Sequence, residues 1–226
     1  LSLVEGITEF LPISSTGHLI LVSRILNLES TDFLKTFEIA IQLGAIMAVV
    51  VLYFNKLMTG GTLVKKLFVA FLPSAIVGFA LYPLIKSVLL SSSSITLFAL
   101  FIGGIALILV EKSLSKSKIQ DSSLQIPTFK QALLIGTFQS LSIVPGVSRA
   151  AATIIGGLLT GLSRQSATEF SFLLAVPTMF AATSLDIYKS KEMLISSDIT
   201  TLLTGMALSF IFAMLAIKFL VGYIKK

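Results

Sequence analysis

The residues best suited to chemistry lie within the first eighteen positions of the chain. They comprise two carboxylates, three consecutive hydroxyls and the only histidine of the 226 residues: Glu5, Glu9, Ser14, Ser15, Thr16 and His18. If residues 1–10 form a helix, the two carboxylates project from one face about one turn apart. Carboxylates, hydroxyls and an imidazole at such a spacing could bind a cation or carry out acid–base and nucleophilic chemistry.

The elements that must position this cluster are two short helices joined by a polar turn. Pro12 ends the first helix, because proline cannot continue a helical hydrogen-bond ladder. The run from Ser14 to Gly17 can reverse the chain and expose backbone N–H groups. Leu19–Leu26 then reads as a second apolar helix. The sequence therefore predicts a helical hairpin with a polar tip.

The carboxylate pair predicts a metal site. Two carboxylates one turn apart repel each other unless one is protonated or a cation lies between them. A hard divalent ion binds carboxylate and phosphate oxygens together and keeps several waters. We therefore expect Glu5 and Glu9 to hold a divalent cation, Mg²⁺ or Ca²⁺, that is shared with a phosphorylated substrate.

The serines of the turn are candidate nucleophiles. Ser15 or Ser14 can act in this way only if a base lies close, and His18 is the only imidazole available. The alternative is that at least one of Ser14, Ser15 and Thr16 caps the next helix. For His18 the alternative is a purely structural role.

A second polar break interrupts the apolar stretch 131–159. Its loop, Pro145-Gly146-Val147-Ser148-Arg149, offers backbone N–H groups, a hydroxyl and a guanidinium at the start of a helix. Proteins grip phosphate oxygens with such groups. Thr153, one turn beyond Arg149, could add a hydroxyl or could bond back to its own helix.

The composition is that of an integral membrane protein. Hydrophobic residues make up 55% of the chain, charged residues only 12%, and the mean hydropathy is +0.98. Long continuous apolar runs favour an all-α bundle of about six spans in one domain over a β-barrel. The net charge of +6 does not indicate nucleic-acid binding, because the lysines lie in short loops between apolar segments. The chain has no cysteine and so no disulfide or thiolate metal site.

The distribution of lysines predicts the topology. Residues 55–66 and 111–130 read as basic cytoplasmic loops, whereas 86–94 and 188–198 read as external turns. The segments 37–54, 67–85, 95–110, 166–187 and 202–224 then cross the membrane. With these orientations, the two polar breaks belong to re-entrant hairpins that enter from opposite faces.

The hairpins also predict an internal duplication. An offset of 131 places His18 on Arg149 and Glu38 on Glu169, and an offset of 130 places Gly6-x-x-Glu9 on Gly136-x-x-Gln139. We therefore expect inverted-topology repeats, about 1–110 and 131–226, joined by the loop 111–130. Such repeats place their site where broken helices meet near the midplane. The mirrored acids Glu38 and Glu169 are expected to have structural roles.

The cost of burying charge predicts that the two polar breaks converge. Unpaired in lipid, Glu5, Glu9 and Arg149 would together cost about 8–10 kcal/mol on insertion-derived scales. They must therefore face one another or a wet cavity. A merely structural pairing of Arg149 with one glutamate would leave the second acid, the histidine and the hydroxyls unexplained.

These motifs together strongly resemble the bacterial undecaprenyl-diphosphate phosphatase family, also known as bacitracin-resistance proteins. The resemblance covers essentially the whole chain and includes the stretches that begin at Phe37 and Glu169. It implies removal of the terminal phosphate of the C55 polyprenyl diphosphate, which recycles the carrier lipid for cell-wall synthesis, with a divalent cation. It also implies a multi-pass protein of the bacterial inner membrane with its site facing outward. The chain looks trimmed at both ends relative to this family.

Carried over by position, the family's site residues fall into two groups. The expected catalytic residues are Glu5, Glu9, Ser15, His18 and Arg149, with Glu5 and Glu9 as metal ligands. The expected substrate-binding residues are Ser14, Thr16, Gly146, Ser148 and Thr153. The family often has serine after the arginine, where this chain has Ala150, so no role is assigned to that position.

Two other functions share some of these features. Inverted repeats with helix ends at the midplane are typical of transporters, so a transporter or flippase for a polyprenyl phosphate is the alternative. The type-two phosphatidic acid phosphatases use similar short motifs but need a second histidine, which this chain lacks. Membrane lipids are the expected surroundings, and the oligomeric state stays open, with a homo-oligomer compatible with the sequence.

Overall fold

The computed structural model describes residues 1–29, 31–81, 93–114, 125–189 and 198–224. Within these ranges the chain forms ten α-helices and one 3₁₀ helix and no strand. The elements in order are α1 (Ser2–Thr8), α2 (Ser15–Ile25), α3 (Asp32–Leu52), α4 (Phe54–Thr59), α5 (Gly61–Ala80), α7 (Ser93–Leu114), α8 (Phe129–Gln139), η2 (Ser140–Ile143), α9 (Arg149–Leu159), α10 (Arg164–Lys189) and α12 (Ile199–Ile224). Some segments discussed from the sequence fall wholly or largely outside these ranges. They are the expected turns 86–94 and 188–198, much of the loop 111–130, and Lys225 and Lys226.

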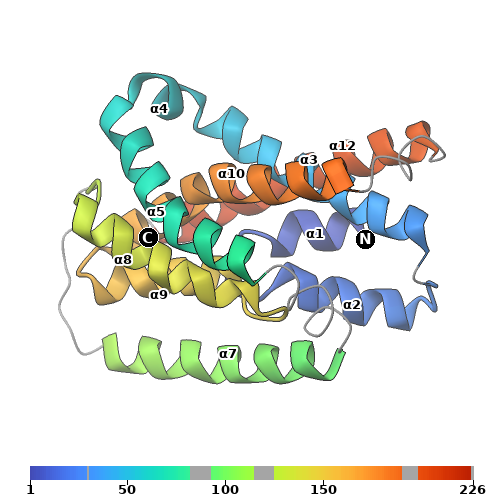
Figure 1. The fold of residues 1–226 in the computed structure, drawn as a ribbon, viewed down its shortest axis with the longest axis horizontal. Helices are drawn as coiled ribbons and strands as arrows, with labels where there is room; N and C mark the ends of the chain where they lie inside the picture. Colours follow the sequence, from blue (N-terminus) through green and yellow to red (C-terminus); the bar gives the residue numbers. More distant parts are fainter. Residues whose placement is uncertain (30, 82–92, 115–124, 190–197, 225–226) are drawn as a thin grey trace.

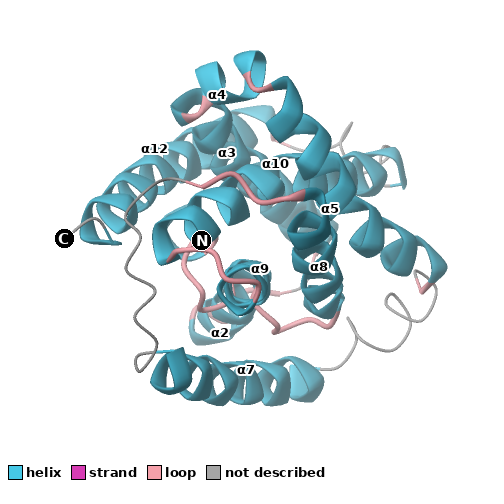
Figure 2. Cartoon of the chain, turned by 90° about the vertical axis from the view of Figure 1, so that its left-hand side faces the viewer, coloured by secondary structure: helices cyan, strands magenta, loops and turns pink. Residues whose placement is uncertain are grey.

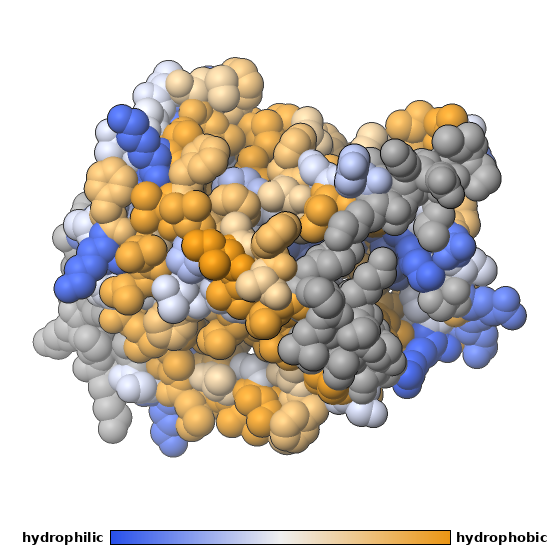
Figure 3. All heavy atoms as spheres, in the orientation of Figure 1, coloured by the Kyte–Doolittle hydropathy of each residue, from blue (hydrophilic) through white to orange (hydrophobic). Residues whose placement is uncertain are grey.

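Five of the described helices are long and apolar enough to cross a membrane. They are Asp32–Leu52, Gly61–Ala80, Ser94–Ser113, Arg164–Leu185 and Ile199–Ile224. These five helices match the five segments that the sequence predicts to cross the membrane. The total of about six spans that the sequence predicts is not reached in the described ranges. Figure 3 shows hydrophobic residues over the middle of one face and hydrophilic residues mostly toward its two sides. This distribution is typical of a membrane protein, in which an apolar belt lies between two ends that contact water.

The shorter helices form two hairpins that enter the bundle from opposite ends (Figure 1). The α1–α2 hairpin comes from the end where the chain begins, and the α8–η2–α9 hairpin comes from the end near α4. Their tips meet in the middle of the molecule. The expected pair of re-entrant helical hairpins is therefore present as a geometric arrangement.

Side-chain caps fix where the hairpin helices begin. Thr128 forms a capping box with Gln131 at the start of α8, and the Gln131 amide also donates to the Thr160 carbonyl oxygen at 2.9 Å. The second contact ties the two ends of the α8–α9 hairpin together. Ser14 caps α2 and Ser148 caps α9. Each hairpin tip thus ends on a serine whose side chain satisfies backbone N–H groups that the helix leaves free.

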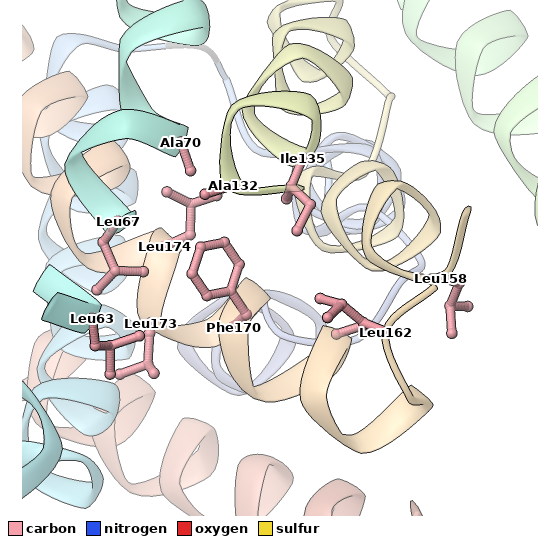
Figure 4. Close-up of a cluster of buried hydrophobic side chains, with 11 residues drawn as sticks. Leu63, Leu67, Ala70, Ala132, Ile135, Leu158, Leu162, Phe170, Leu173 and Leu174 are labelled. Carbon is pink, nitrogen blue, oxygen red and sulfur yellow. The ribbon is translucent and has the colours of Figure 1, made fainter. Parts of the chain in front are cut away.

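The core consists of two clusters that hold the hairpins against the long helices. Figure 4 shows the cluster in which α5, α8 and α10 meet, with Phe170 lying among leucines and alanines. The second cluster packs Phe10, just after α1, edge-to-face against Phe172 of α10, with ring centroids 5.5 Å apart. Both hairpins therefore rest on α10.

Glycines let each hairpin approach a long helix closely. A Cβ at Gly6 of α1 would lie 2.6 Å from the Ser209 carbonyl oxygen of α12, and one at Gly136 of α8 would lie 2.0 Å from the Ala70 carbonyl oxygen of α5. Small residues at such crossings are how membrane helices approach backbone to backbone. Figure 2 shows α7 at the edge of the bundle, beside α9 and α2.

The segment 55–66 is largely helical, so its prediction as a loop is wrong. Tyr53 and Gly60 leave helical geometry, and between them α4 forms around the good helix formers Lys56, Leu57 and Met58. Lys56 of α4 pairs with the buried Glu169 at 2.6 Å, whose carboxylate also accepts a hydrogen bond from Gln165. Lys66, already inside α5, lies over the Phe129 ring at 5.5 Å. The lysines thus lie on helices and extend their charged ends from the apolar belt.

Candidate active site

The two hairpin tips enclose a polar cavity of about 200 Å³. Its walls come from both hairpins, from α3 and from α10, and comprise Glu9, Ser14, Ser15, Thr16, Gln42, Ser142, Val147, Ser148, Arg149, Thr178, Met179 and Ala182. Six of the ten residues expected from the sequence line it. The other four, Glu5, His18, Gly146 and Thr153, lie behind its walls.

Glu9 lies at the centre of the site because it contacts both hairpins. Its Oε2 accepts a hydrogen bond from Ser15 Oγ at 2.5 Å, and its Oε1 accepts one from Arg149 Nη2 at 3.2 Å. The expected convergence of Glu9 and Arg149, 140 residues apart in the chain, is confirmed. The base beside Ser15 is a carboxylate rather than the imidazole considered from the sequence.

The Arg149 guanidinium forms hydrogen bonds on two sides and still has N–H groups that bond to no described residue. Besides Glu9, it donates from Nη1 to the Ser171 carbonyl oxygen at 3.1 Å, and its buried Nε has no hydrogen-bond partner among the described residues. Its side chain is 10% exposed and that of Glu9 is 7% exposed. A guanidinium with unused N–H groups at the wall of a cavity can bind a phosphate through charge-assisted hydrogen bonds.

Glu5 supplies a buried carboxylate oxygen that no group in the described chain satisfies. The residue is 1% exposed and its Oε1 has no hydrogen-bond partner. Glu9, Glu38 and Arg149 are the charged groups that act on it. The described residues contain no group of three or more His, Cys, Asp or Glu side chains placed for a metal. Two carboxylates nevertheless suit Mg²⁺, which commonly binds one or two carboxylates plus substrate phosphates, so Glu5 and Glu9 fit such an ion.

The turn before α2 is strained and is fastened by His18. Ser14 has φ of 65°, a left-handed conformation uncommon for a residue other than glycine. Its side chain accepts a hydrogen bond from Gly17 N, and its carbonyl oxygen lies 2.8 Å from His18 Nδ1. Because a carbonyl only accepts hydrogen bonds, Nδ1 carries the proton. His18 therefore holds the turn from behind the cavity wall and does not contact Ser15 through this nitrogen.

Gly146 shapes the opposite tip without lining the cavity. Its φ is +96°, and a Cβ there would come within 2.2 Å of the Thr96 carbonyl oxygen of α7. Only glycine meets both constraints. Ser148, which lines the cavity, accepts a hydrogen bond from Ala151 N at 3.1 Å as the cap of α9. The loop therefore presents the start of α9, with its free N–H groups, to the cavity.

Thr153 lies within the protein, and its hydroxyl bonds back to its own helix, which is one of the two alternatives that the sequence left open. It is fully buried, and its hydroxyl donates to backbone carbonyls of its own helix, including that of Arg149 at 2.9 Å. The same hydroxyl lies 2.6 Å from Ser171 Oγ. Since the Ser171 carbonyl oxygen holds the guanidinium, Thr153 supports Arg149 from behind.

Sequence reasoning did not select three polar residues that line the cavity. The sequence did not assign Gln42, Ser142 or Thr178 to the substrate site. Thr178 Oγ1 donates to the Leu174 carbonyl oxygen and accepts a hydrogen bond from Gln139 Nε2 at 3.0 Å. The available signals were a serine inside the second polar break and a hydroxyl directly after Pro177, in the apolar middle of a span that carries several other hydroxyls.

The arrangement is suited to phosphoryl transfer. A hydroxyl hydrogen-bonded to a carboxylate is an activated nucleophile. A guanidinium, a helix N-terminus and two carboxylates suited to a cation can neutralise phosphate oxygens. All of these groups converge on one cavity, as positioning and charge stabilisation of a phosphoryl group require.

Comparisons with known proteins agree with this chemistry. The sequence profile of the family described as bacitracin resistance protein BacA matches residues 1–226. A protein of Persephonella marina named undecaprenyl-diphosphatase is 54% identical over 227 residues, covering 100% of this chain and 88% of the relative. Proteins of the same name from Aquifex aeolicus and Thermus thermophilus are 48% and 44% identical, covering 100% of this chain and 88% and 87% of the relatives.

Proposed function

The chain belongs to the bacitracin resistance protein BacA family, and from this membership we propose that it hydrolyses undecaprenyl diphosphate to undecaprenyl phosphate and inorganic phosphate. The protein is then a membrane hydrolase that recycles a carrier lipid for cell-wall synthesis. Relatives at about half identity carry the name of this enzyme. The observation that carries the proposal is the pairing of Glu9 with both Ser15 and Arg149 inside a cavity.

In the first step, Ser15 Oγ attacks the terminal phosphorus while its proton passes to Glu9 Oε2. The bond between the terminal phosphorus and the bridging oxygen breaks, and undecaprenyl phosphate leaves with that oxygen. Arg149 moves its hydrogen bonds from Glu9 to the phosphate oxygens when the diphosphate enters. Glu9 Oε2 stays hydrogen-bonded to Ser15 and is placed to take its proton when Ser15 reacts.

In the second step, water attacks the phosphorylated Ser15. Glu9 has by then passed its first proton to the departing undecaprenyl phosphate, so it takes a proton from the water and returns it to Ser15 Oγ as the phosphorus–Oγ bond breaks and inorganic phosphate is released. The helix start at Ser148 and the hydroxyls of Thr16 and Ser142 hold phosphate oxygens throughout. These contacts follow from the residues that line the cavity.

A divalent cation, Mg²⁺ or Ca²⁺, fits the same scheme. Glu5 and Glu9 would hold it, with the unsatisfied Glu5 Oε1 as an available ligand atom. When bound, it supplies positive charge that neutralises the diphosphate. The chain's own residues position the substrate and move the proton.

The hairpins support inverted-topology repeats in the bacterial inner membrane. The hairpin helix α1 of the first repeat packs on α12 of the second, and α8 of the second repeat packs on α5 of the first, with Gly6 and Gly136 at the two crossings. The lysines of α4 and the first turns of α5 lie at the end from which α8 and α9 enter. By the positive-inside rule that end faces the cytoplasm. The polar cavity then opens to the outer face, where the diphosphate lipid would be met.

Phosphate release from undecaprenyl diphosphate by the purified, detergent-solubilised protein tests the proposal. We expect release with Mg²⁺ or Ca²⁺ and its loss with a chelator, restored by the metal. In detergent no membrane separates two compartments, so no ion or substrate gradient exists. A transporter or flippase breaks no phosphate bond and would therefore release no phosphate. Absence of phosphate release under all metal conditions would overturn the proposed function.

A further inference from the structure

Thr178 lines the polar cavity but takes no part in the two proposed steps. Its hydroxyl forms two hydrogen bonds, and neither partner lines the cavity. Thr178 Oγ1 donates to the Leu174 carbonyl oxygen of its own helix at 2.8 Å and accepts from Gln139 Nε2 of α8 at 3.0 Å. A hydroxyl has one hydrogen and two lone pairs. One lone pair is therefore left for the cavity.

The hydrogen of this hydroxyl is held away from the cavity. A carbonyl oxygen only accepts hydrogen bonds, so Thr178 Oγ1 and the Leu174 oxygen need the hydrogen between them. Gln139 is fully buried and also donates from Nε2 to Ser74 Oγ of α5 at 2.7 Å, which fixes the amide in place. With the amide turned over, its oxygen would accept the Thr178 hydrogen, which again points away from the cavity. Thr178 thus offers the cavity an acceptor and no donor.

The other hydroxyls of the cavity wall are less restricted. Each of these five side chains forms at most one hydrogen bond within the described residues, so each can turn a hydrogen toward a bound phosphate. Arg149 and the N–H groups at the start of α9 are donors as well. Negatively charged phosphate oxygens only accept hydrogen bonds. A fixed acceptor among these donors is therefore unsuited to phosphate and suits a ligand that brings its own hydrogens.

Water is the reactant that brings such hydrogens into the cavity. We propose that Thr178 Oγ1 accepts one hydrogen of the attacking water while Glu9 Oε2 accepts the other. This inference rests on the proposed function, because it takes the cavity to be the place where phosphate is released. With both hydrogens held, a lone pair of the water oxygen is aimed at the phosphorus, and such orientation lowers the barrier to attack.

The step balances without any chemical change in Thr178. The water oxygen forms a bond to the phosphorus, and the bond from the phosphorus to Ser15 Oγ breaks. One hydrogen of the water passes to Glu9 Oε2 and from there to Ser15 Oγ. The other hydrogen stays on the attacking oxygen, still bonded to Thr178, and leaves as a hydrogen of inorganic phosphate. Thr178 therefore acts only by orienting the water.

Competition between water and methanol tests this role on the purified, detergent-solubilised protein. Methanol can attack in place of water and gives methyl phosphate in place of inorganic phosphate. Its oxygen carries a single hydrogen, which goes to Glu9, so methanol gains nothing from Thr178. Undecaprenyl diphosphate labelled with ³²P in its terminal phosphate is supplied at a fixed methanol concentration, and the ratio of the two products is measured. A change confined to folding or substrate binding does not move this ratio, because both products come from the same bound phosphoryl group.

Thr178→Val is expected to raise the ratio of methyl phosphate to inorganic phosphate about 2- to 10-fold, the effect of one neutral hydrogen bond. Thr178→Ser keeps the hydroxyl and is expected to keep the ratio. Thr137→Val is the matched control. The Thr137 hydroxyl also bonds back to its own helix, at the Leu133 carbonyl oxygen, but it is exposed on α8 and does not line the cavity. We expect this control to leave both the ratio and the turnover unchanged.

A double variant, Thr178→Val with Gln139→Leu, serves if Thr178→Val alone does not fold. It removes both partners of the buried hydrogen bond, so no amide N–H is left facing the new valine. Gln139→Leu by itself retains the Thr178 hydroxyl. We therefore expect the product ratio to rise in the double variant and to stay near that of the unaltered protein in Gln139→Leu.

The outcomes separate this role from the proposed function. An unchanged ratio in Thr178→Val and in the double variant, or no methyl phosphate from either of them, overturns the role in orienting water while phosphate release upholds the function. An unchanged ratio with a higher metal requirement places Thr178 beside a water bound to the cation and also overturns the role. No phosphate release by the unaltered protein under any metal condition overturns both.

Discussion

Ser15 Oγ lies 2.5 Å from Glu9 Oε2, so the proposed nucleophile and its proposed proton acceptor come from the same hairpin, six residues apart. Arg149 reaches the other oxygen of the same carboxylate from the second hairpin. One carboxylate thus contacts both the hydroxyl proposed to attack and the guanidinium proposed to bind phosphate. Each prediction below follows from this link or from the packing that maintains it.

Glu9→Gln should lower turnover by about 10²–10⁴-fold, because an amide cannot take the proton of Ser15. The measurement is kcat for phosphate release. Glu169→Gln is the matched control, since that buried carboxylate pairs with Lys56 and does not line the polar cavity. We expect little change from Glu169→Gln, and equal losses from both variants would argue against a specific role for Glu9.

Arg149→Lys should reduce turnover about 10²-fold or more while the protein stays folded. Lysine keeps the positive charge beside Glu9 but lacks the planar fork that binds two phosphate oxygens and Ser171 together. Arg149→Ala should in addition cost about 3–5 kcal/mol of stability, because it leaves a buried carboxylate unpaired. Phosphate release and thermal unfolding of the two variants check this, and wild-type turnover by Arg149→Lys would remove the guanidinium from the scheme.

His18→Asn should keep much of the activity that His18→Ala loses. The asparagine amide can donate to the Ser14 carbonyl oxygen in place of Nδ1 and so hold the strained turn before Ser15. A positioning role predicts rescue by asparagine and no shift in the pH profile of kcat. A general-base role predicts that both variants are equally inactive, which kcat measured against pH will reveal.

Gly136→Ala should destabilise the protein by about 1–3 kcal/mol, because its Cβ would meet the Ala70 carbonyl oxygen at 2.0 Å. Gly104→Ala is the matched control in α7, where a Cβ meets nothing within 4 Å. Helix propensity alone makes the control neutral or stabilising by up to about 1 kcal/mol. Thermal unfolding of both variants tests the close crossing of α8 and α5.

The positions of the membrane spans and the meeting of the hairpins could be predicted from the sequence because each follows from a large free-energy term. An unpaired charge in lipid is costly enough to require a partner, and Glu9 and Arg149 satisfy each other as expected. Lysines at segment ends indicated which hairpin enters from which end. The helix α4 was missed, because Lys56 reads as a loop residue until its buried partner Glu169 is known.

The finer geometry of the site could not be predicted because it depends on single dihedral angles and on helix rotation. Ser15 meets Glu9 rather than His18, and the turn before it holds Ser14 in a left-handed conformation that the residue types do not predict. Thr153 does not line the cavity, and its hydroxyl bonds to its own helix and to Ser171. Thr178 lines the cavity but is one of several hydroxyl-bearing residues of α10, so its residue type alone does not single it out.

Chemical trapping of the phosphorylated enzyme tests the central claim most directly. Undecaprenyl diphosphate labelled with ³²P in its terminal phosphate is mixed with the purified protein, the reaction is stopped with dodecyl sulfate at neutral pH, where phosphoserine and phosphohistidine both survive, and labelled peptides are sequenced. We predict label on Ser15, absent in Ser15→Ala together with phosphate release. Label on His18, or full phosphate release by Ser15→Ala, would contradict Ser15 as the group that accepts the phosphoryl.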